Sequence, residues 1–192
     1  MGVEQTYRNS IRKLKGFCFK TYLQLHGCKV GSGLKCYSFP KIRAVPKGNI
    51  TIGNDVTFGF RCTLEITKKG SLVIENNVNI TQNVLISSNA KILIGEYALI
   101  GENVSIRDSS HGINKNEKIQ KQASLSKEVT IGEDVWIGVN SIILKGSVLN
   151  NGAVIGANSL VLEKSKIEGF KVYAGSPVIF IKDRKWKQQP KN

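Results

Sequence analysis

The sequence predicts an all-β solenoid: a parallel β-helix of hexapeptide repeats, with a short N-terminal helix and an extruded loop. Three observations lead to this fold class. Apolar residues recur at every sixth position, which matches neither the period of about 3.6 of a helix nor the period of two of a simple strand. The composition contains 19 Gly but only 4 Pro. The Val, Ile and Leu residues stand in many short runs, as in strands separated by tight turns.

The length of 192 residues predicts one domain with small appendages. We assign residues 1–30 to a basic amphipathic helix, 31–182 to the β-helix domain with a loop at 107–130, and 183–192 to a basic tail. The chain has 28 basic and 14 acidic residues, a formal net charge of +14. Such an excess of positive charge indicates an anionic partner or substrate.

The N-terminal helix is predicted from apolar residues at intervals of three and four, with basic residues between them. These apolar residues are Tyr7, Ile11, Leu14, Cys18, Tyr22 and Leu25. We expect the helix to pack this apolar face on the body of the protein. A basic amphipathic helix can also lie on an anionic membrane surface, so peripheral membrane association is the alternative.

The hexapeptide repeat is unbroken in the C-terminal half. Its apolar positions are Ile131, Ile137, Ile143, Leu149, Ile155, Val161, Ile167 and Tyr173. Small or β-branched residues follow four positions later, from Val135 to Ser165. The same phase appears upstream in shorter blocks that begin at Ile52, Ile74 and Ile94. In a β-helix these residues point into a prism, and stacked coils bury them against one another.

These repeats resemble those of the hexapeptide-repeat acyltransferases. The resemblance rests on Ile-Gly-x-(Asp/Asn)-(Val/Ser) runs that begin at Ile52, Ile131, Ile137 and Ile155, and on the ending Ala174-Gly-Ser-Pro. More narrowly, the chain is similar to the sugar O-acetyltransferases, including the galactoside and maltose acetyltransferases and the enzymes that acetylate capsule and O-antigen sugars. The resemblance implies a left-handed coil, a homotrimer with active sites between subunits, and acetyl-CoA as the donor.

The loop at 107–130 is the first place to look for chemistry, because a rigid solenoid can carry a site on an insertion. It contains His111, one of two histidines in the chain. Acyl transfer to a hydroxyl needs a base that titrates near neutral pH, which suits an imidazole. The family also places its catalytic histidine at this kind of position. Asp108 is our candidate for orienting His111, with a turn-capping role as the alternative.

The resemblance also implies residues for the donor and the acceptor. Trp136 matches a family tryptophan beside the acceptor and the thioester, and Gly138 and Ala157 match positions along the pantetheine arm. Lys182 is a candidate for the coenzyme A phosphates, because cationic side chains bind phosphate. For the acceptor, Asn83 lies near the expected place, whereas Thr81 aligns better with the substrate-binding Asn of the galactoside enzymes. Corner packing and a solvated tail are the structural alternatives for these residues.

Cysteine usage indicates a reducing compartment. The four cysteines form no C-x-x-C pair, so we expect reduced, packed thiols, and two histidines are too few for the three ligands per zinc of a carbonic anhydrase. Arginines and lysines interrupt every apolar stretch near the N-terminus, so neither a signal peptide nor a membrane span is predicted. We expect a cytoplasmic protein, with the inner face of the membrane as the alternative place.

The resemblance therefore implies an acetyl-CoA-dependent O-acetyltransferase that acts on a sugar hydroxyl in surface polysaccharide biosynthesis, with no metal requirement. The alternatives are an N-acetyltransferase on a nucleotide-linked amino sugar, a xenobiotic acetyltransferase and a binding-only scaffold. Nucleic-acid binding is not predicted despite the charge, because the sequence has no recognition helix, aromatic platform motif or zinc finger.

Overall fold

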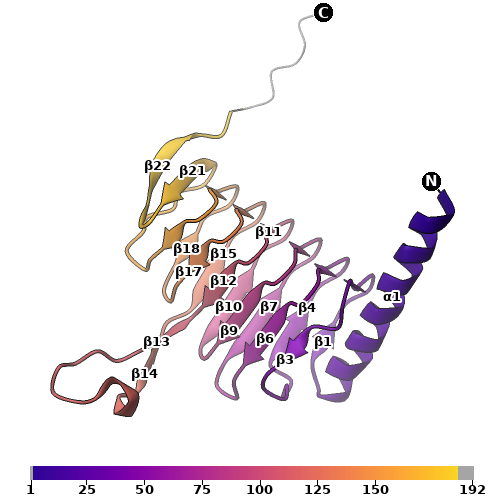
Figure 1. The fold of residues 1–192 in the computed structure, drawn as a ribbon, viewed down its shortest axis with the longest axis horizontal. Helices are drawn as coiled ribbons and strands as arrows, with labels where there is room; N and C mark the ends of the chain where they lie inside the picture. Colours follow the sequence, from indigo (N-terminus) through magenta and orange to yellow (C-terminus); the bar gives the residue numbers. More distant parts are fainter. Residues whose placement is uncertain (1, 186–192) are drawn as a thin grey trace, which may run out of the picture.

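A computed structural model describes residues 2–185 and shows a three-faced prism of stacked coils with a helix at its N-terminal end (Figure 1). The helix, α1, spans Gly2–Leu25. An extruded loop leaves the side of the prism, and a short hairpin stands at its C-terminal end (Figure 1). The parallel β-helix predicted from the hexapeptide period is confirmed, and it is consistent with the left-handed coil that the resemblance implies. Residues 186–192 of the predicted tail lie outside the described residues.

Three sheets, parallel throughout except for the last strand β22 (Val178–Asp183), form the faces of the prism, which we call A, B and C. Face A contains β1 (Lys29–Val30), β4 (Ile50–Ile52), β7 (Ser71–Ile74), β10 (Lys91–Ile94), β15 (Val129–Ile131) and β18 (Val148–Leu149). Face B contains β2 (Lys35–Cys36), β5 (Thr57–Phe58), β8 (Asn79–Ile80), β11 (Leu99–Ile100), β16 (Trp136–Ile137), β19 (Val154–Ile155), β21 (Lys171–Gly175) and β22 (Val178–Asp183). Face C contains β3 (Lys41–Ile42), β6 (Thr63–Ile66), β9 (Leu85–Ser88), β12 (Ser105–Arg107), β17 (Ile142–Ile143) and β20 (Leu160–Val161). The first coil begins at Lys29, two residues before the expected boundary, because β1 pairs in register with β4.

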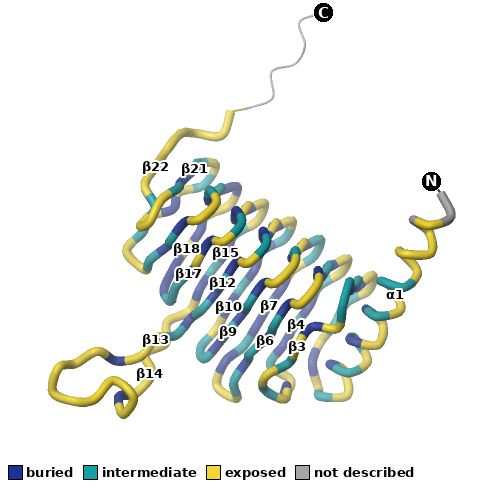
Figure 2. Tube along the Cα trace, viewed as in Figure 1, coloured by how far each residue is buried: buried dark blue, intermediate teal, exposed yellow. Residues whose placement is uncertain are grey.

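The every-sixth apolar residues stack in columns inside the prism. On face B, Phe58 pairs with Ile80, Ile80 with Ile100, and Ile100 with Ile137. All the predicted interior residues from Ile131 to Tyr173 are buried, as are those of the upstream blocks. Figure 2 shows this alternation as dark inner segments beneath exposed turns. Each coil therefore adds one layer to a continuous apolar core, which stabilises its neighbours.

The slips of register in the upstream blocks have one structural origin. Steps from face A to B and from B to C are six residues throughout, whereas the step from C to A varies. It is six residues from Ile143 to Leu149, but ten from Leu64 to Ile74. The longest insertion, the loop between β12 and β15, leaves at this same C/A edge. The prism thus concentrates its extra residues on one of its three edges.

Helix α1 covers the N-terminal end of the prism, as expected, but through a different face. Phe19 and Leu23 are fully buried, and the Phe19 ring meets the Phe58 ring edge-on at 6.0 Å. Of the predicted stripe, Tyr7 is 66% exposed and Leu25 80% exposed. Leu14 and Cys18 of the stripe are exposed as well, whereas Tyr22 packs partly buried against the core, so the prediction was wrong for most of the stripe. Phe19 and Leu23, which close the prism end, lie on a different face of the helix.

The C-terminal end is closed by the antiparallel hairpin of β21 and β22. The Tyr173 ring, the last interior residue, packs edge-on against Phe180 at 5.9 Å. Among the described residues there is no helix long and apolar enough to span a membrane. All four cysteines are unpaired, and three are buried, but Cys18 is exposed on α1, which corrects the expectation that every thiol is packed.

Candidate functional site

The extruded loop is more ordered than the polar sequence suggests. Its arms β13 (Ser109–His111) and β14 (Ser124–Ser126) pair antiparallel, and a 3-10 turn covers Ile119–Lys121. The side chain of Gln122 organises the tip, since it donates to the carbonyl oxygens of Asn114 and Glu117 at 2.8 Å. Arg107 and Val129–Thr130, which we had assigned to the loop, belong to β12 and β15. The loop proper therefore runs from Asp108 to Glu128.

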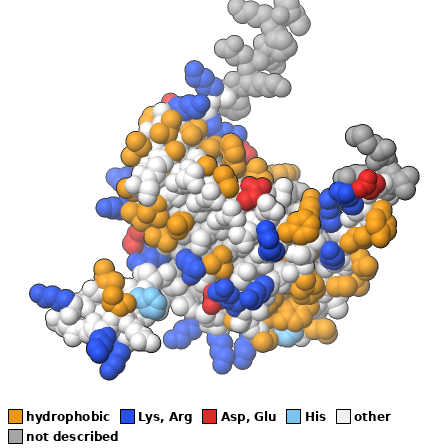
Figure 3. All heavy atoms as spheres, in the orientation of Figure 1, with side chains coloured by type: hydrophobic (Ala, Val, Ile, Leu, Met, Phe, Trp, Pro, Cys, Tyr) orange, Lys and Arg blue, Asp and Glu red, His pale blue; other side chains and the backbone are white. Residues whose placement is uncertain are grey.

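His111 lies exposed at the end of β13, the first arm of this hairpin, and pairs with Ser124. Figure 3 shows basic side chains on the outer part of the extruded loop. Within residues 2–185 no hydrogen bond to the imidazole of His111 is found. Both ring nitrogens are therefore available to a substrate hydroxyl, as a general base requires.

Asp108 anchors the loop to the coil below and does not orient His111. Its buried carboxylate accepts hydrogen bonds from the Ser88 hydroxyl at 2.6 Å and from the backbone N–H groups of Asn89 and Ala90 at 2.7 and 2.8 Å. Both oxygens are thus engaged by the preceding C/A turn. Asp108 therefore caps a turn of the preceding coil and not the turn of its own loop, which was our alternative. Within residues 2–185 no hydrogen bond joins Asp108 to His111, so in one chain Asp108 does not orient the imidazole.

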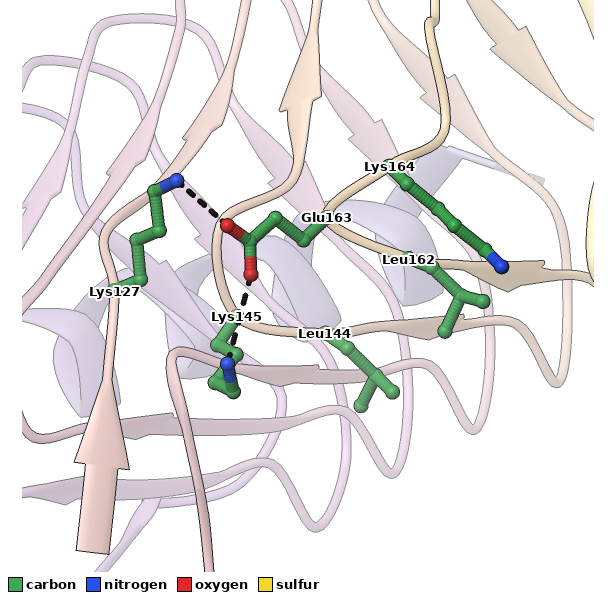
Figure 4. Close-up of a pocket in the computed structure, with 6 residues that line it drawn as sticks. All are labelled: Lys127, Leu144, Lys145, Leu162, Glu163 and Lys164. Atoms are coloured by element: carbon green, nitrogen blue, oxygen red, sulfur yellow. Dashed lines mark hydrogen bonds and ion pairs between the residues drawn. The ribbon is translucent and has the colours of Figure 1, made fainter.

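Above the loop base, the C/A edge carries a hollow of about 590 Å³ (Figure 4). Leu144 and Leu162 form its apolar part. Glu163 binds Lys127 of the loop base at 2.7 Å and Lys145 at 3.5 Å, and the hydrogen bond and charge of Lys127 lower the pKa of Glu163. Lys164 completes the lining without an ion pair to any described residue. The hollow therefore combines an apolar surface with net positive charge, directly beside the loop that carries His111.

The candidate donor residues lie on face B and on the B/C edge. Trp136 projects outward from β16 and is 51% exposed. Gly138 follows it at the turn and is buried between coils, where an added Cβ would approach the Ala157 nitrogen to 2.6 Å. Coil stacking alone therefore requires glycine at 138. Ala157 is exposed one coil farther on. Lys182 is exposed on β22 and pairs across from Val172.

An asparagine ladder runs along the same B/C edge. Asn83 donates to Asn103 at 2.7 Å, Asn103 to Asn140 at 2.9 Å, and Asn140 to Asn158 at 3.1 Å, each from side-chain Nδ2 to Oδ1. All four have φ between 56° and 61°, the left-handed region that Asn tolerates better than most residues. The amide of Asn83 is thus engaged in the turn, which gives it a structural role.

Thr81, the alternative to Asn83, lines a hollow of about 300 Å³ on the outside of face B. Asn79, Phe60 and Glu102 lie in the same hollow. Sequence analysis missed these three residues. Asn79 precedes an interior position and so points outward, and Glu102 shares a turn with Asn103, so the repeat register was the signal that would have found them.

Within one chain the structure does not bring His111 to Trp136. The loop leaves at the C/A edge, which in a three-faced prism is opposite face B, where Trp136 lies. No group of three or more His, Cys, Asp or Glu suited to a metal occurs in the described part of the chain. One side of the prism thus carries the exposed imidazole of His111, and the other carries the exposed Trp136 ring beside the turn of Gly138.

Residues 128–163 match the sequence profile of the family described as Bacterial transferase hexapeptide (six repeats), which confirms the hexapeptide resemblance for this segment. No curated protein sequence matches the chain.

Solved structures similar to this chain share its fold. A variant of AntD, an N-acyltransferase from Bacillus cereus in complex with dTDP-4-amino-4,6-dideoxyglucose and coenzyme A, has a TM-score of 0.74 at 24% identity, over 87% of this chain and 89% of that one. A maltose O-acetyltransferase from Clostridium difficile has a TM-score of 0.57 at 22% identity, over 96% and 90%. A hexapeptide-repeat acetyltransferase from Vibrio cholerae has a TM-score of 0.55 at 20% identity, over 96% and 94%.

Proposed function

We propose that this hexapeptide-repeat protein is an acyltransferase that moves an acetyl group from acetyl-CoA to a hydroxyl of a sugar destined for a surface polysaccharide. The observation that carries the proposal is the exposed His111, held on an ordered hairpin that Asp108 and Lys127 fix to a rigid prism. The resemblance of the hexapeptide runs supports this chemistry, and the similar acyltransferase structures share the prism.

In the reaction, the imidazole of His111 removes the proton of the sugar hydroxyl as its oxygen attacks the thioester carbonyl carbon. The C–O bond forms, the C–S bond breaks, and the thiolate of coenzyme A leaves and is protonated by the imidazolium. Backbone N–H groups at the coil turns would stabilise the developing oxyanion. Neither step requires a metal.

We further propose that the site is completed between two copies in a homotrimer. His111 and Trp136 lie on opposite sides of one prism, so a single chain does not unite base and donor surface. In the proposed ring, the C/A edge of one copy would face the B/C edge of the next, which brings His111 of one chain to Trp136 of its neighbour. The pantetheine arm would follow Gly138 and Ala157 of one chain. Lys182, and the lysines around Glu163 on the other chain, would bind the phosphates.

The function is tested with His111→Ala, because loss of a general base lowers turnover by roughly 10²–10⁴-fold. Release of free coenzyme A thiol in the presence of an acceptor is the readout, and the oligomer should be unchanged. His26→Gln is the matched control, since His26 is the only other histidine and its Nδ1 lies 2.8 Å from the Tyr22 carbonyl oxygen. Turnover of the His111 variant near that of wild type would refute the assignment.

The intersubunit site is tested by mixing His111→Ala with Trp136→Ala chains after denaturation and refolding. If each site uses one residue from each of two neighbours, about a quarter of the sites in random trimers are intact. Activity should then rise well above that of either variant alone. A mixture no more active than its parts would show that both residues act within one chain.

A second candidate function is N-acylation of an amino sugar carried on a nucleotide. It is favoured by the structural similarity to AntD, which has a higher TM-score than the O-acetyltransferase from Clostridium difficile. A panel of sugars and of nucleotide-linked amino sugars with labelled acetyl-CoA separates the two. Label that is stable to mild base marks an amide, and label that is released marks an ester.

A further inference from the structure

A groove lies between helix α1 and the outside of face B. It consists of three adjoining hollows of about 300, 410 and 430 Å³, and Tyr37 lines all three. Thr57 and Asn79 are shared by the first two, and Arg12 by the last two. Shared walls make the hollows one continuous feature, which we call the helix groove. It runs from the N-terminal helix toward Thr81 and belongs to neither the loop nor the donor surface.

The helix end of the groove is strongly basic. Five cationic residues line it: Arg8, Arg12, Lys13, Lys15 and Lys35. The only lining carboxylate among the described residues, Glu102, lies at the opposite end. Arg8 is paired with Glu4, and the Lys15 ammonium donates to the Tyr37 carbonyl. No carboxylate within residues 2–185 pairs with Arg12, Lys13 or Lys35, so their charge is available to a ligand.

Arg12 is already positioned. Its guanidinium carbon lies 3.9 Å from the centre of the Tyr37 ring, and one terminal nitrogen donates to Asn9 at 3.2 Å. A cation held over an aromatic face loses little further conformational freedom on binding. The remaining donors of the planar fork suit two oxygens of a phosphate. Lys35 faces the same hollow from β2 and adds a second positive charge.

The other end of the groove has the chemistry of a sugar site. Phe60 is 49% exposed and meets Tyr37 edge-on at 5.3 Å, which leaves an aromatic surface for the apolar side of a sugar ring. Asn79, Thr81 and the carboxylate of Glu102 offer donors and acceptors for hydroxyls. The groove therefore joins a phosphate-binding end to a sugar-binding end.

The distance between the basic hollow and Trp136 indicates how long a ligand must be to reach both. On face B, Thr57 pairs with Asn79, Asn79 with Leu99, and Leu99 with Trp136. Neighbouring strands are about 4.8 Å apart, so Thr57 and Asn79 in the basic hollow lie roughly 10–14 Å from Trp136, and the Lys35 backbone, one strand farther on, lies about 19 Å from it. The Lys35 side chain lines the same hollow as Thr57 and Asn79 and so shortens this span. A sugar with one phosphate is too short to reach both places. A sugar and a diphosphate laid end to end have the matching length.

We propose that the helix groove binds the diphosphate of a sugar-diphosphate acceptor, with Arg12 and Lys35 at the phosphates and the sugar directed toward Thr81 and Trp136. This inference rests on the proposed function for the identity of the reacting sugar, but the binding site stands on its own. The acceptor is then an activated sugar, so acetylation precedes the glycosyl transfer that would release the diphosphate. The diphosphate can come from a nucleotide or from a prenyl carrier.

Binding is tested by calorimetry on the full chain at physiological salt, with inorganic pyrophosphate, uridine diphosphate and farnesyl diphosphate as probes. The double variant R12Q/K35Q should bind the probes at least tenfold more weakly. The control K68Q/K69Q removes the same charge from exposed turn lysines at the C/A edge and should leave binding within twofold. Because Arg12 also packs on Tyr37, K35E is measured as a second variant, and thermal melts verify that each variant is folded.

The three probes distinguish the two sources of the diphosphate, a nucleotide and a prenyl carrier. Tighter binding of uridine diphosphate than of pyrophosphate identifies a nucleotide carrier, tighter binding of farnesyl diphosphate a prenyl carrier, and equal binding recognition of the diphosphate alone. The proposal is overturned if both double variants lose the same affinity, if K35E binds like wild type, or if saturating coenzyme A displaces the probe. The binding measurements use no acetyl-CoA, so their outcome does not depend on the activity of the His111→Ala variant. Failure of the binding proposal likewise leaves the activity test of His111 valid.

Discussion

The Ser88 hydroxyl donates a 2.6 Å hydrogen bond to the buried carboxylate of Asp108, across the C/A edge at the point where the chain leaves the prism. The neighbouring N–H groups of Asn89 and Ala90 complete the binding of this carboxylate. One turn of the preceding coil thereby fixes the root of the loop that carries His111. We expect the position of the hairpin relative to the prism to depend on these hydrogen bonds.

We expect Asp108→Asn to destabilise the protein by about 1–3 kcal/mol, because an amide places a donor against a backbone donor in a buried site. For a chain of this size the Tm should fall by roughly 3–10 °C. Cleavage of the loop by protease should become faster than in wild type. Glu117→Gln, an exposed carboxylate on the same loop, is the control. An unchanged Tm for Asp108→Asn would mean that the anchor is dispensable.

The asparagine ladder predicts that two substitutions at Asn103, whose φ is 59°, destabilise the protein by different amounts. Alanine loses both ladder hydrogen bonds and must also adopt a left-handed conformation, at about 1–2 kcal/mol. Glycine loses the same hydrogen bonds but adopts that φ freely. Equilibrium unfolding in urea should therefore rank wild type above Asn103→Gly, and Asn103→Gly above Asn103→Ala. Equal stability of the two variants would show that the left-handed backbone conformation does not limit which residue is tolerated at position 103.

The packing of helix α1 on the first coil predicts that Gly16→Ala destabilises the protein, although Ala has the higher helix propensity. In an isolated helix Ala is favoured over Gly by about 1 kcal/mol. In this structure a Cβ at Gly16 would collide with the Leu34 carbonyl oxygen, because the helix backbone lies directly on the first coil. Gly16→Ala should therefore lower the Tm, whereas Gln24→Ala on the exposed side should leave it nearly unchanged. A Gly16→Ala protein more stable than wild type would place the helix elsewhere.

The prism was predictable because its signal is repeated. Ile137 alone says little, but eight apolar residues at one spacing have no other structural explanation, and the structure buries all of them. We expected the helix over residues 1–30, but α1 ends at Leu25 and the first coil begins at Lys29, and the buried face of the helix was not predicted either. Phe19 and Leu23 fill the open end of the prism, a surface that exists only after the coils have formed. Tertiary packing here overrides the most regular local pattern.

The candidate site also contains residues that were anticipated before the structure and residues that were not. Thr81 and Trp136 were implied by the family resemblance, and both lie on the outside of face B. A turn-capping role for Asp108 was one of our alternatives, but its partners Ser88 and Ala90 lie one coil earlier, so the sequence did not identify the turn that it binds. Arg12, which lines the helix groove, appears in the sequence only as one of several basic residues on a helix. Its position over Tyr37 depends on how the helix docks.

Thiol chemistry gives a prediction that bears on the activity assay. Burial raises the pKa of Cys36 to about 12 and also raises that of Cys62, so both stay protonated and unreactive at neutral pH. Cys18 is exposed on α1. The folded protein should release one equivalent of chromophore from a disulfide reagent at pH 8, and four after denaturation. Cys18→Ser should abolish the fast equivalent.

The control for this prediction is the reaction of the protein's own thiols with the reagent in the absence of acetyl-CoA. Wild-type protein without acetyl-CoA should consume reagent only through Cys18, so the variant gives a flat baseline for thiol release. Two or more fast equivalents in the folded state would contradict the burial of Cys28, Cys36 and Cys62 and would indicate that the N-terminal coils open.

The ion pairs of Glu163 predict a pH-dependent attachment of the loop base. Lys127 and Lys145 lower the pKa of Glu163 from its ordinary value near 4.5. A carboxylate with a lowered folded-state pKa contributes stability above its unfolded pKa and loses it as the pH falls through the folded value. Glu163→Gln should therefore have a slightly lower Tm than wild type at pH 7 and low salt.

That difference should shrink as the pH falls from about 5 toward 3, and it should also shrink in 1 M salt, because exposed ion pairs are screened. Hydrogen exchange of the Lys127 amide, which donates to the Asp108 carbonyl at 2.9 Å, should accelerate in the variant at pH 7 only. Glu128→Gln is the matched control, since Glu128 lies beside the same edge but meets only Lys91, at 3.9 Å. A difference that persists unchanged at pH 3 would assign the effect to packing of the Glu163 side chain and not to its charge.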